Sequence, residues 1–403
     1  MHQRWLREPL VAALLLLLLS GCAGESGRGG QEEEQASEDA LNAALEKSFE
    51  ESGAPGVVAA VQTPEYTWVE TRGVADRTSE EPMTPDVHQR IGSVTKTFTV
   101  SLLLQAAAQG LLSLDDTIDQ YVEGIPNGDS ITLRQMASMT SGIASYTFNE
   151  QFLNDLFSDP ERVWKPEELV QFGIADSPAF DPGTEFQYSN TNTVLLGLVL
   201  QQVSGKPIGD LYREQIIEPL GLQQTSFPNT DPSLPDPHAQ GYTLQGQDDA
   251  EIGNATDWNP SWGWTAGAMI STLDDLLIYG RALGSGEGLL PPEQQAERLD
   301  SFPSDEVPPN TADRAYGLGL GREYGWLGHT GELPGYNTAV YYNPGLNATV
   351  VVEVNSDIPS GECPEDNPTM TDAPQDGIPC ADPAVRILGG LAEALGRPFG
   401  TEQ

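Results

Sequence analysis

Val-rich runs with the character of β-strands occur near both ends of the chain, and helical patterns fill the long stretch between them. Helical spacing is clearest at residues 194–203 and 211–220. The strand-like runs lie at residues 56–62, 67–73, 317–320, 325–329, 338–342 and 348–355. A sheet drawn from both ends of a chain, with helices inserted in the middle, is an α+β domain. We therefore predict one domain at residues 39–400, a helical subdomain at about 97–300, and a site in the cleft between the two parts.

Helical patterns also flank the predicted strands. Leu41, Leu45 and Phe49 are spaced for one buried face of a helix at residues 40–51, and a last helix is predicted at residues 384–395. Residues 23–38 are rich in Gly, Glu and Ser and have almost no apolar side chains. They predict a flexible acidic tether.

The first 22 residues have the features of an export signal. Arg4 and Arg7 precede an apolar run at residues 10–19, which is too short for a good membrane span and is followed by small residues. The sequence ending at Cys22 also resembles the bacterial lipobox, in which the cysteine is diacylated and becomes the mature N-terminus. We expect an exported lipoprotein anchored through Cys22 to the outer face of the bacterial cell membrane. The alternative is an ordinary signal peptide whose cysteine happens to lie near the cleavage site.

The other two cysteines, Cys363 and Cys380, predict a disulfide, because exported proteins form such bonds. The segment between them is rich in proline and acidic residues and has no core-forming pattern, so we interpret it as a stapled surface loop. A metal site is disfavoured, because no histidine lies nearby and two thiolates do not complete a tetrahedral site.

The charge of the chain argues against nucleic acid as a partner. Asp and Glu number 60 against 19 Lys and Arg, for a net charge of −41 at pH 7. Such a surface repels phosphate backbones and anionic lipid headgroups. It suits a protein kept soluble outside the cell or at high salt.

Gly92-Ser93-Val94-Thr95-Lys96 marks the start of a predicted helix. Ser93 and Lys96 would lie on one helix face about 5–6 Å apart at Cβ, so the amine can reach the hydroxyl. Burial and the positive end of the helix both lower the pKa of the amine towards that of a useful base. The amide of Ser93, in the unpaired first turn, can face a developing oxyanion. In isolation the two residues would be interpreted as a helix cap and a surface charge.

Tyr188-Ser189-Asn190 follows a predicted turn and leads into a helix. A phenol held beside a lysine is favoured as the phenolate and can relay a proton between nucleophile and leaving group. Asn190 offers a donor and an acceptor to a substrate amide. Tyr341-Tyr342-Asn343 repeats the spacing within an alternating strand, and we interpret it as sheet packing.

His329-Thr330-Gly331 is predicted on a strand near the C-terminal side. Gly331 allows a ligand backbone to approach closely, and an exposed strand edge here could pair with an extended peptide. The amide of Glu332 is a candidate second oxyanion donor, and Thr330 a candidate carboxylate ligand. A lone histidine after a strand would otherwise be interpreted as structural.

Taken together, the order and spacing of these three motifs resemble the penicillin-recognising serine hydrolases. These comprise actinomycete-type serine D-Ala-D-Ala carboxypeptidases, class C β-lactamases and their esterase relatives. Further stretches that carry the resemblance lie at residues 131–135, 140–142, 197–205, 218–222 and 316–319. The resemblance implies a β-lactamase/transpeptidase-like fold, in which an antiparallel sheet is flanked by N- and C-terminal helices and carries a large all-helical insertion. His329, where many relatives have lysine, is the form found in the actinomycete carboxypeptidases.

The resemblance also implies roles for individual residues. Ser93 attacks a carbonyl, and Lys96 and Tyr188 move protons. Asn190 orients Lys96 and the substrate amide, and residues 329–331 line the site. Trp262 falls where the carboxypeptidases place an aromatic wall.

Two departures from the family pattern concern an anionic substrate. Gly321 stands where the nearest relatives have a basic residue for the terminal carboxylate. Arg322 comes one residue later, so on a strand it would face the other way. Glu332 adds a negative side chain directly after His329-Thr330-Gly331.

Our first hypothesis is a D-Ala-D-Ala carboxypeptidase-like enzyme that acts on cell-wall stem peptides and binds penicillin. A β-lactamase differs by fast deacylation, and an esterase or amidase of the same family needs no carboxylate clamp. A non-catalytic binding protein is disfavoured because Ser93, Lys96 and Tyr188 are all present. A Ser-His-Asp hydrolase is disfavoured because no Gly-x-Ser-x-Gly occurs. Nothing calls for a metal or organic cofactor, and we expect a monomer.

Overall fold

The computed structural model describes residues 26–247, 251–303, 308–364, 368–370, 373–374 and 377–400. The predicted export signal and its Cys22 lie outside the described residues. Within the described ranges, no helix combines the length and the apolar character needed to cross a membrane.

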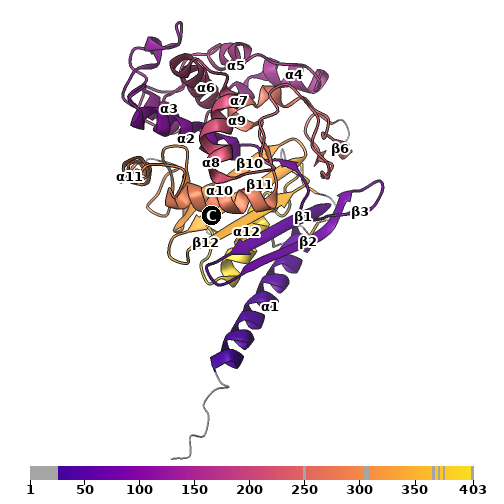
Figure 1. Ribbon diagram of the computed structural model, residues 1–403. Helices are drawn as coiled ribbons and strands as arrows, with labels where there is room; N and C mark the ends of the chain where they lie inside the picture. Colours follow the sequence, from indigo (N-terminus) through magenta and orange to yellow (C-terminus); the bar gives the residue numbers. More distant parts are fainter. Residues whose placement is uncertain are drawn as a thin grey trace, which may run out of the picture.

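An eight-stranded antiparallel sheet forms the centre of the fold, in the order β3-β2-β1-β12-β11-β10-β9-β8 (Figure 1). Its strands are β1 (Gly56–Gln62), β2 (Thr67–Asp76), β3 (Glu81–Pro82), β8 (Arg314–Tyr316), β9 (Gly321–Glu323), β10 (Trp326–Leu333), β11 (Tyr336–Asn343) and β12 (Ala348–Val354). The two ends of the chain meet where β1 pairs with β12. Every residue of β11 and β12 is buried, because helices cover both faces of the sheet. The predicted α+β fold is confirmed.

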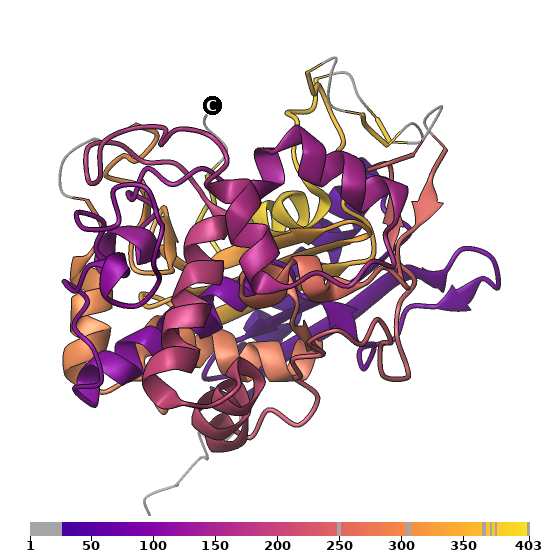
Figure 2. The ribbon, with the colours of Figure 1, turned by 90° about the horizontal axis from the view of Figure 1, so that it is seen from above.

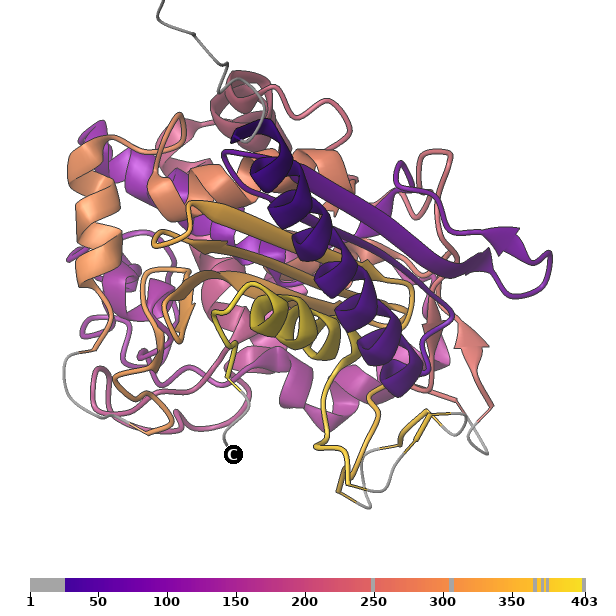
Figure 3. The same ribbon diagram turned by 90° about the horizontal axis from the view of Figure 1, so that it is seen from below.

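Helices α1 (Ser26–Ser52) and α12 (Pro383–Ala394) cover one face of the sheet (Figure 3). Leu41 and Leu45 of α1 share an apolar cluster with Ile387 and Leu391 of α12. The predicted tether at residues 23–38 is corrected here, because α1 already begins at Ser26. Glu, Gln and Ala are good helix formers, and a helix nucleated by its packed half extends readily into such residues.

The other face of the sheet carries the helical part of the molecule (Figure 2). Its helices are α2 (Val94–Ala108), α3 (Leu133–Ala137), α4 (Glu150–Ser158), α5 (Pro166–Gly173), α6 (Asn190–Ser204), α7 (Ile208–Tyr212), α8 (Glu218–Leu220), α9 (Trp264–Gly267), α10 (Leu273–Ser285) and α11 (Pro292–Asp300). Shorter turns are η1 (Ile118–Gln120), η2 (Tyr146–Phe148), η3 (Arg213–Ile217, a π-helical turn) and η4 (Pro260–Trp262). Helix α2 is buried on nearly all sides, and its buried residues include polar ones such as Thr97 and Ser101, which hydrogen-bond within the core.

The prediction of an all-helical insertion at about 97–300 needs two corrections. Helix α10 packs on β11 and β12, so it belongs to the sheet layer. The insertion also contains short strands: β5 (Tyr242–Thr243) pairs with β6 (Gly253–Asn254), and β7 (Ile270–Ser271) pairs with β4 (Gln89–Arg90), which precedes the insertion.

The strand predicted at residues 317–320 is instead the turn between β8 and β9. Gly319 lies within it at φ +61°, a conformation that glycine adopts without strain. The predicted disulfide between Cys363 and Cys380 is present. Its loop packs through Met370 and Ala373 against Ile358.

Candidate active site

Ser93 and Lys96 are brought together at the start of α2. Lys96 is fully buried, and its Nζ lies 2.8 Å from Ser93 Oγ and donates to the carbonyl oxygen of Ala266 at 2.7 Å. No carboxylate pairs with the amine among the described residues. Burial lowers the pKa of Lys96 well below its usual value, so the amine can hold a free lone pair. The Ser93 side chain makes no capping hydrogen bond to the helix, which removes the helix-cap interpretation.

Strand β10 passes directly beside the turn that carries Ser93. A Cβ added to Gly331 would clash with the carbonyl oxygen of Ile91 and would lie 3.2 Å from the amide nitrogen of Ser93. On the other side of the contact, a Cβ added to Gly92 would lie 2.6 Å from the amide nitrogen of Glu332. Glycine at both positions thus lets the Ser93 and Glu332 amides approach each other. Two such amides can share one oxyanion.

Tyr188 lies beside the pair, with its ring centroid 4.9 Å from Lys96 Nζ. The buried Tyr188 hydroxyl has no hydrogen-bond partner of good geometry among the described residues. It nevertheless lies close enough to the Ser93 hydroxyl for Ser93 to lower the pKa of Tyr188. Burial raises the pKa of Tyr188, and Glu332 adds to the rise. The expected phenolate is therefore corrected, because the loss of hydration on burial is the largest influence on the Tyr188 pKa and favours the neutral phenol. Tyr188 is a phenol with a free donor.

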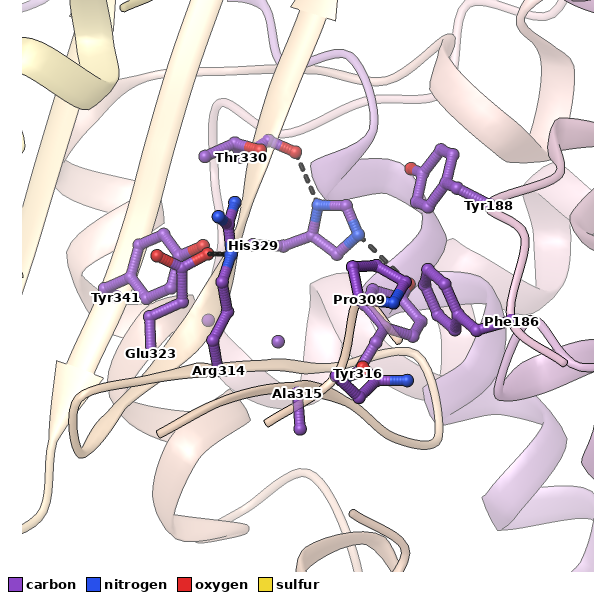
Figure 4. Close-up of a pocket in the computed structure, with 13 residues that line it drawn as sticks. Phe186, Tyr188, Pro309, Arg314, Ala315, Tyr316, Glu323, His329, Thr330 and Tyr341 are labelled. Atoms are coloured by element: carbon purple, nitrogen blue, oxygen red, sulfur yellow. Dashed lines mark hydrogen bonds and ion pairs between the residues drawn. The ribbon is translucent and has the colours of Figure 1, made fainter. Parts of the chain in front are cut away.

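His329 on β10 is held by hydrogen bonds at both ring nitrogens. Nδ1 donates to the carbonyl oxygen of Thr330, and Nε2 accepts from the Tyr316 hydroxyl at 3.0 Å (Figure 4). Burial lowers the pKa of His329 to about 4, with Lys96 adding to the fall and the Thr330 carbonyl opposing it. His329 is therefore neutral at pH 7. Because both nitrogens are occupied, it orients its neighbours and keeps positive charge away from Lys96.

We expect NMR to show His329 as a neutral ring from pH 8 down to about pH 5.5. The folded pKa lies below the ordinary value of a histidine, so protonation is delayed until the pH falls towards 4. A His329→Gln variant identifies the signal, and ¹⁵N shifts report the Nδ1–H tautomer. A titration midpoint between pH 6 and 7 would contradict this account of the site.

A cavity of about 330 Å³ opens beside His329 (Figure 4). Tyr188, His329 and Thr330 line it together with Tyr341, which also belongs to the sheet as the sequence predicted. The remaining lining residues are Phe186, Pro309, Asn310, Arg314, Ala315, Tyr316, Gly321, Glu323 and Gly328. The cavity thus adjoins the residues that would move protons, and it is wide enough for a small leaving group.

Two expected site residues make contacts other than the expected ones. The Asn190 side chain is not hydrogen-bonded to Lys96, because its Nδ2 donates to Thr147 Oγ1 at 3.0 Å; the Ala266 carbonyl holds the lysine instead. Trp262 is not part of the cavity wall. Its ring lies 6.4 Å from the Phe152 ring, so it packs with the core of the helical part.

The contacts of Arg322 and Glu332 are not those expected of residues that bind a substrate carboxylate. Arg322 faces away from the cavity, as strand alternation predicts, and its guanidinium stacks 4.7 Å from the Phe302 ring. The Glu332 carboxylate accepts from Gln245 Nε2 at 3.2 Å. Loss of hydration, together with Asp382 and Asp357, raises the pKa of Glu332. The negative charge expected there is therefore weakened.

Sequence reasoning missed four contributors to the site. Ala266 acts through its backbone carbonyl, which carries no side-chain signal. Tyr316 opens one of the motif stretches at residues 316–319 but had no role assigned. Arg314 and Glu323 face each other across β8 and β9, a pairing that depends on where the intervening turn lies.

Comparisons with known proteins agree with this geometry. The family model described as Beta-lactamase matches residues 41–375. A crystal structure of a D-stereospecific amidohydrolase from Streptomyces sp. is 32% identical with a TM-score of 0.71, and the match covers 80% of this chain and 94% of that one. The D-amino acid amidase from Ochrobactrum anthropi SV3, complexed with L-phenylalanine amide, is 26% identical with a TM-score of 0.72, over 88% of this chain and 98% of that one.

A protein named Beta-lactamase from Pseudomonas fluorescens is 34% identical over 179 residues, which are 43% of this chain and 46% of that protein. The chain spans about half the length of the curated relatives it matches. The family model, in contrast, covers most of the chain, including Ser93, Lys96, Tyr188 and His329. The protein therefore belongs to the Beta-lactamase family and is a serine hydrolase of that family.

Proposed function

We propose that the protein is a D-stereospecific amidohydrolase that cleaves the amide bond after a D-amino acid through an acyl-enzyme on Ser93. The observation that carries the proposal is the fully buried Lys96 amine 2.8 Å from Ser93 Oγ, beside a cavity without a free cation. The similarity to a D-stereospecific amidohydrolase and to a D-amino acid amidase supports the choice of substrate.

In the proposed reaction, the neutral Lys96 amine takes the proton of Ser93 as Oγ attacks the substrate carbonyl. The amides of Ser93 and Glu332 stabilise the oxyanion. Tyr188, whose raised pKa keeps it protonated, gives its proton to the leaving nitrogen and regains one from Lys96. The C–N bond breaks and the acyl-enzyme remains. A water, deprotonated by the same amine, then attacks the ester; the C–Oγ bond breaks, the amine returns the proton to Ser93 Oγ, and the D-amino acid is released.

Hydrolysis of D- and L-phenylalanine amide tests the proposal. We expect kcat/KM to favour the D-enantiomer by roughly 100-fold or more, because the two amides and Tyr188 fix the carbonyl and the leaving group and leave one direction for the side chain. Ammonia release measures both reactions. Equal rates for the two enantiomers, or hydrolysis of neither one, would contradict the proposal.

A D-Ala-D-Ala carboxypeptidase is the second candidate. It is favoured by Arg314, which lines the cavity and is a cation that a terminal carboxylate could reach. Against it, Arg314 already pairs with Glu323 at 3.2 Å. Release of D-alanine from D-Ala-D-Ala, faster than ammonia from D-alanine amide, would reverse the order of the two candidates.

A further inference from the structure

Arg314 and Glu323 form an ion pair that lines the cavity beside His329. Arg314 and Glu323 are directly opposite each other on β8 and β9, with Nε 3.2 Å from Oε1, and both line the cavity with Thr330 (Figure 4). We propose that this pair sets the leaving-group specificity of the enzyme: Glu323 neutralises Arg314, so the cavity accepts a neutral leaving group and rejects one that carries a carboxylate. The inference rests on the proposed function and names the residues that select its substrate.

The presence of Tyr188 in its wall assigns the cavity to the leaving group. A departing nitrogen must face the group that protonates it, and Tyr188 lines the cavity. Glu332, whose amide is the second oxyanion donor, lies further along β10 and does not line it. The acyl part of a substrate therefore extends past Glu332, and the leaving part enters the cavity.

The charges in the cavity favour a neutral group. Among the described residues that line it, Arg314 is the only cation, because His329 is neutral at pH 7. Arg322, the other arginine of this region, donates to the carbonyl oxygen of Ala312 and faces away. A substrate carboxylate that approached Arg314 would lie beside the Glu323 carboxylate, which already pairs with Arg314 Nε.

The surroundings of the two side chains make Glu323 the stronger competitor. The Glu323 side chain is 19% exposed, whereas that of Arg314 is 70% exposed. Burial raises the pKa of Glu323 and Arg314 opposes the rise, so the carboxylate depends on the guanidinium for stabilisation. A partner held on the neighbouring strand also competes at high effective concentration. The Glu323 carboxylate would thus provide specificity by repelling a leaving group that carries a negative charge.

Two substrates that differ by one charge in the leaving group test the inference: D-Ala-D-Ala and its C-terminal amide. Release of D-alanine or of D-alaninamide gives kcat/KM for the same scissile bond. We expect the wild-type enzyme to prefer the amide. In Glu323→Gln, which frees Arg314, the dipeptide-to-amide ratio should rise about 10- to 100-fold, the range of one charge-assisted hydrogen bond.

Three variants serve as controls. The double variant Arg314→Gln/Glu323→Gln should lose the gain, and Arg314→Gln alone should lower the ratio further. Glu287→Gln removes an ion pair of the same 3.2 Å length outside the cavity and should leave the ratio unchanged. A ratio in Glu323→Gln within about twofold of wild type would overturn the inference.

The inference can fail separately from the proposed function. If the wild type cleaves neither substrate nor D-phenylalanine amide, the proposed function fails. The cavity is then tested by the rate at which benzylpenicillin, which carries a carboxylate, and its methyl ester acylate Ser93, measured by intact mass. Faster acylation by the acid in Glu323→Gln would still support the inference, and an unchanged acid-to-ester ratio would overturn it.

Discussion

Replacing Ser93 by alanine should lower the hydrolysis of D-amino acid amides by about 10⁴-fold or more and abolish covalent labelling by benzylpenicillin. Ser93 Oγ is the hydroxyl beside the buried Lys96 amine, and the turn that carries it packs closely against Gly331 and Glu332. Without Oγ no acyl-enzyme forms. Any remaining hydrolysis then requires water to attack the substrate carbonyl directly, without the hydrogen bond between Ser93 and Lys96. Intact mass after incubation with the drug measures the adduct, and peptide mapping locates it.

The Ser93→Ala protein should remain folded, because it loses one hydrogen bond of about 1 kcal/mol. Ser285→Ala, at the exposed end of α10, is the matched control and should label fully. An adduct that persists on Ser93→Ala would assign the nucleophile to another residue. In the wild type, a stable adduct indicates slow deacylation, and drug turnover without an adduct favours a β-lactamase.

The sequence could predict those parts of the site that depend on local geometry. Ser93 and Lys96 are three residues apart at the start of a helix, so helix geometry alone brings them together. The strands at both ends of the chain were predictable because runs such as residues 56–62 and 348–355 are rich in valine, a residue that favours strands. Helix α12 was predictable because its apolar residues recur at helical spacing, which indicates one buried face.

Contacts across the sheet edge could not be predicted. The hydrogen bond from Tyr316 to His329 and the pairing of Arg314 with Glu323 both depend on a turn at residues 317–320. Leu318 and Leu320 made that segment resemble a strand, although their burial comes from tertiary packing. A misplaced turn shifts every cross-strand partner, which explains why the sequence did not indicate that Arg314 lines the cavity.

The ionisation of Tyr188 was mispredicted for a different reason. Sequence reasoning paired the phenol with a charged lysine, whereas the fold buries both groups. Burial lowers the pKa of Lys96 well below its usual value and raises that of Tyr188, so burial favours the uncharged form of both groups. The depth of burial depends on α2, α9 and β10 meeting at one point, and no single motif reports it.

Replacing Lys96 by methionine should lower kcat about 10³- to 10⁴-fold without lowering the stability of the protein. Methionine fills a similar volume, so no large cavity forms, but it has no lone pair to take the Ser93 proton. The folded pKa of Lys96 lies below the unfolded value of 10.5, so at pH values between the two the unfolded chain binds more protons than the folded chain. The wild type therefore loses stability as the pH falls below about 10.5, and the methionine variant is relieved of that loss.

The two measurements together separate catalysis from structure. Thermal unfolding of Lys96→Met at pH 7 should give a Tm equal to or above that of the wild type, while hydrolysis and penicillin acylation both slow. Lys165→Met, an exposed lysine directly before α5, should change neither quantity. If Lys96 had only a structural role, its replacement would lower activity only to the extent that it lowers Tm. Full activity in Lys96→Met would show that another group activates Ser93, since the buried amine is the one base placed within 2.8 Å of its hydroxyl in the described chain.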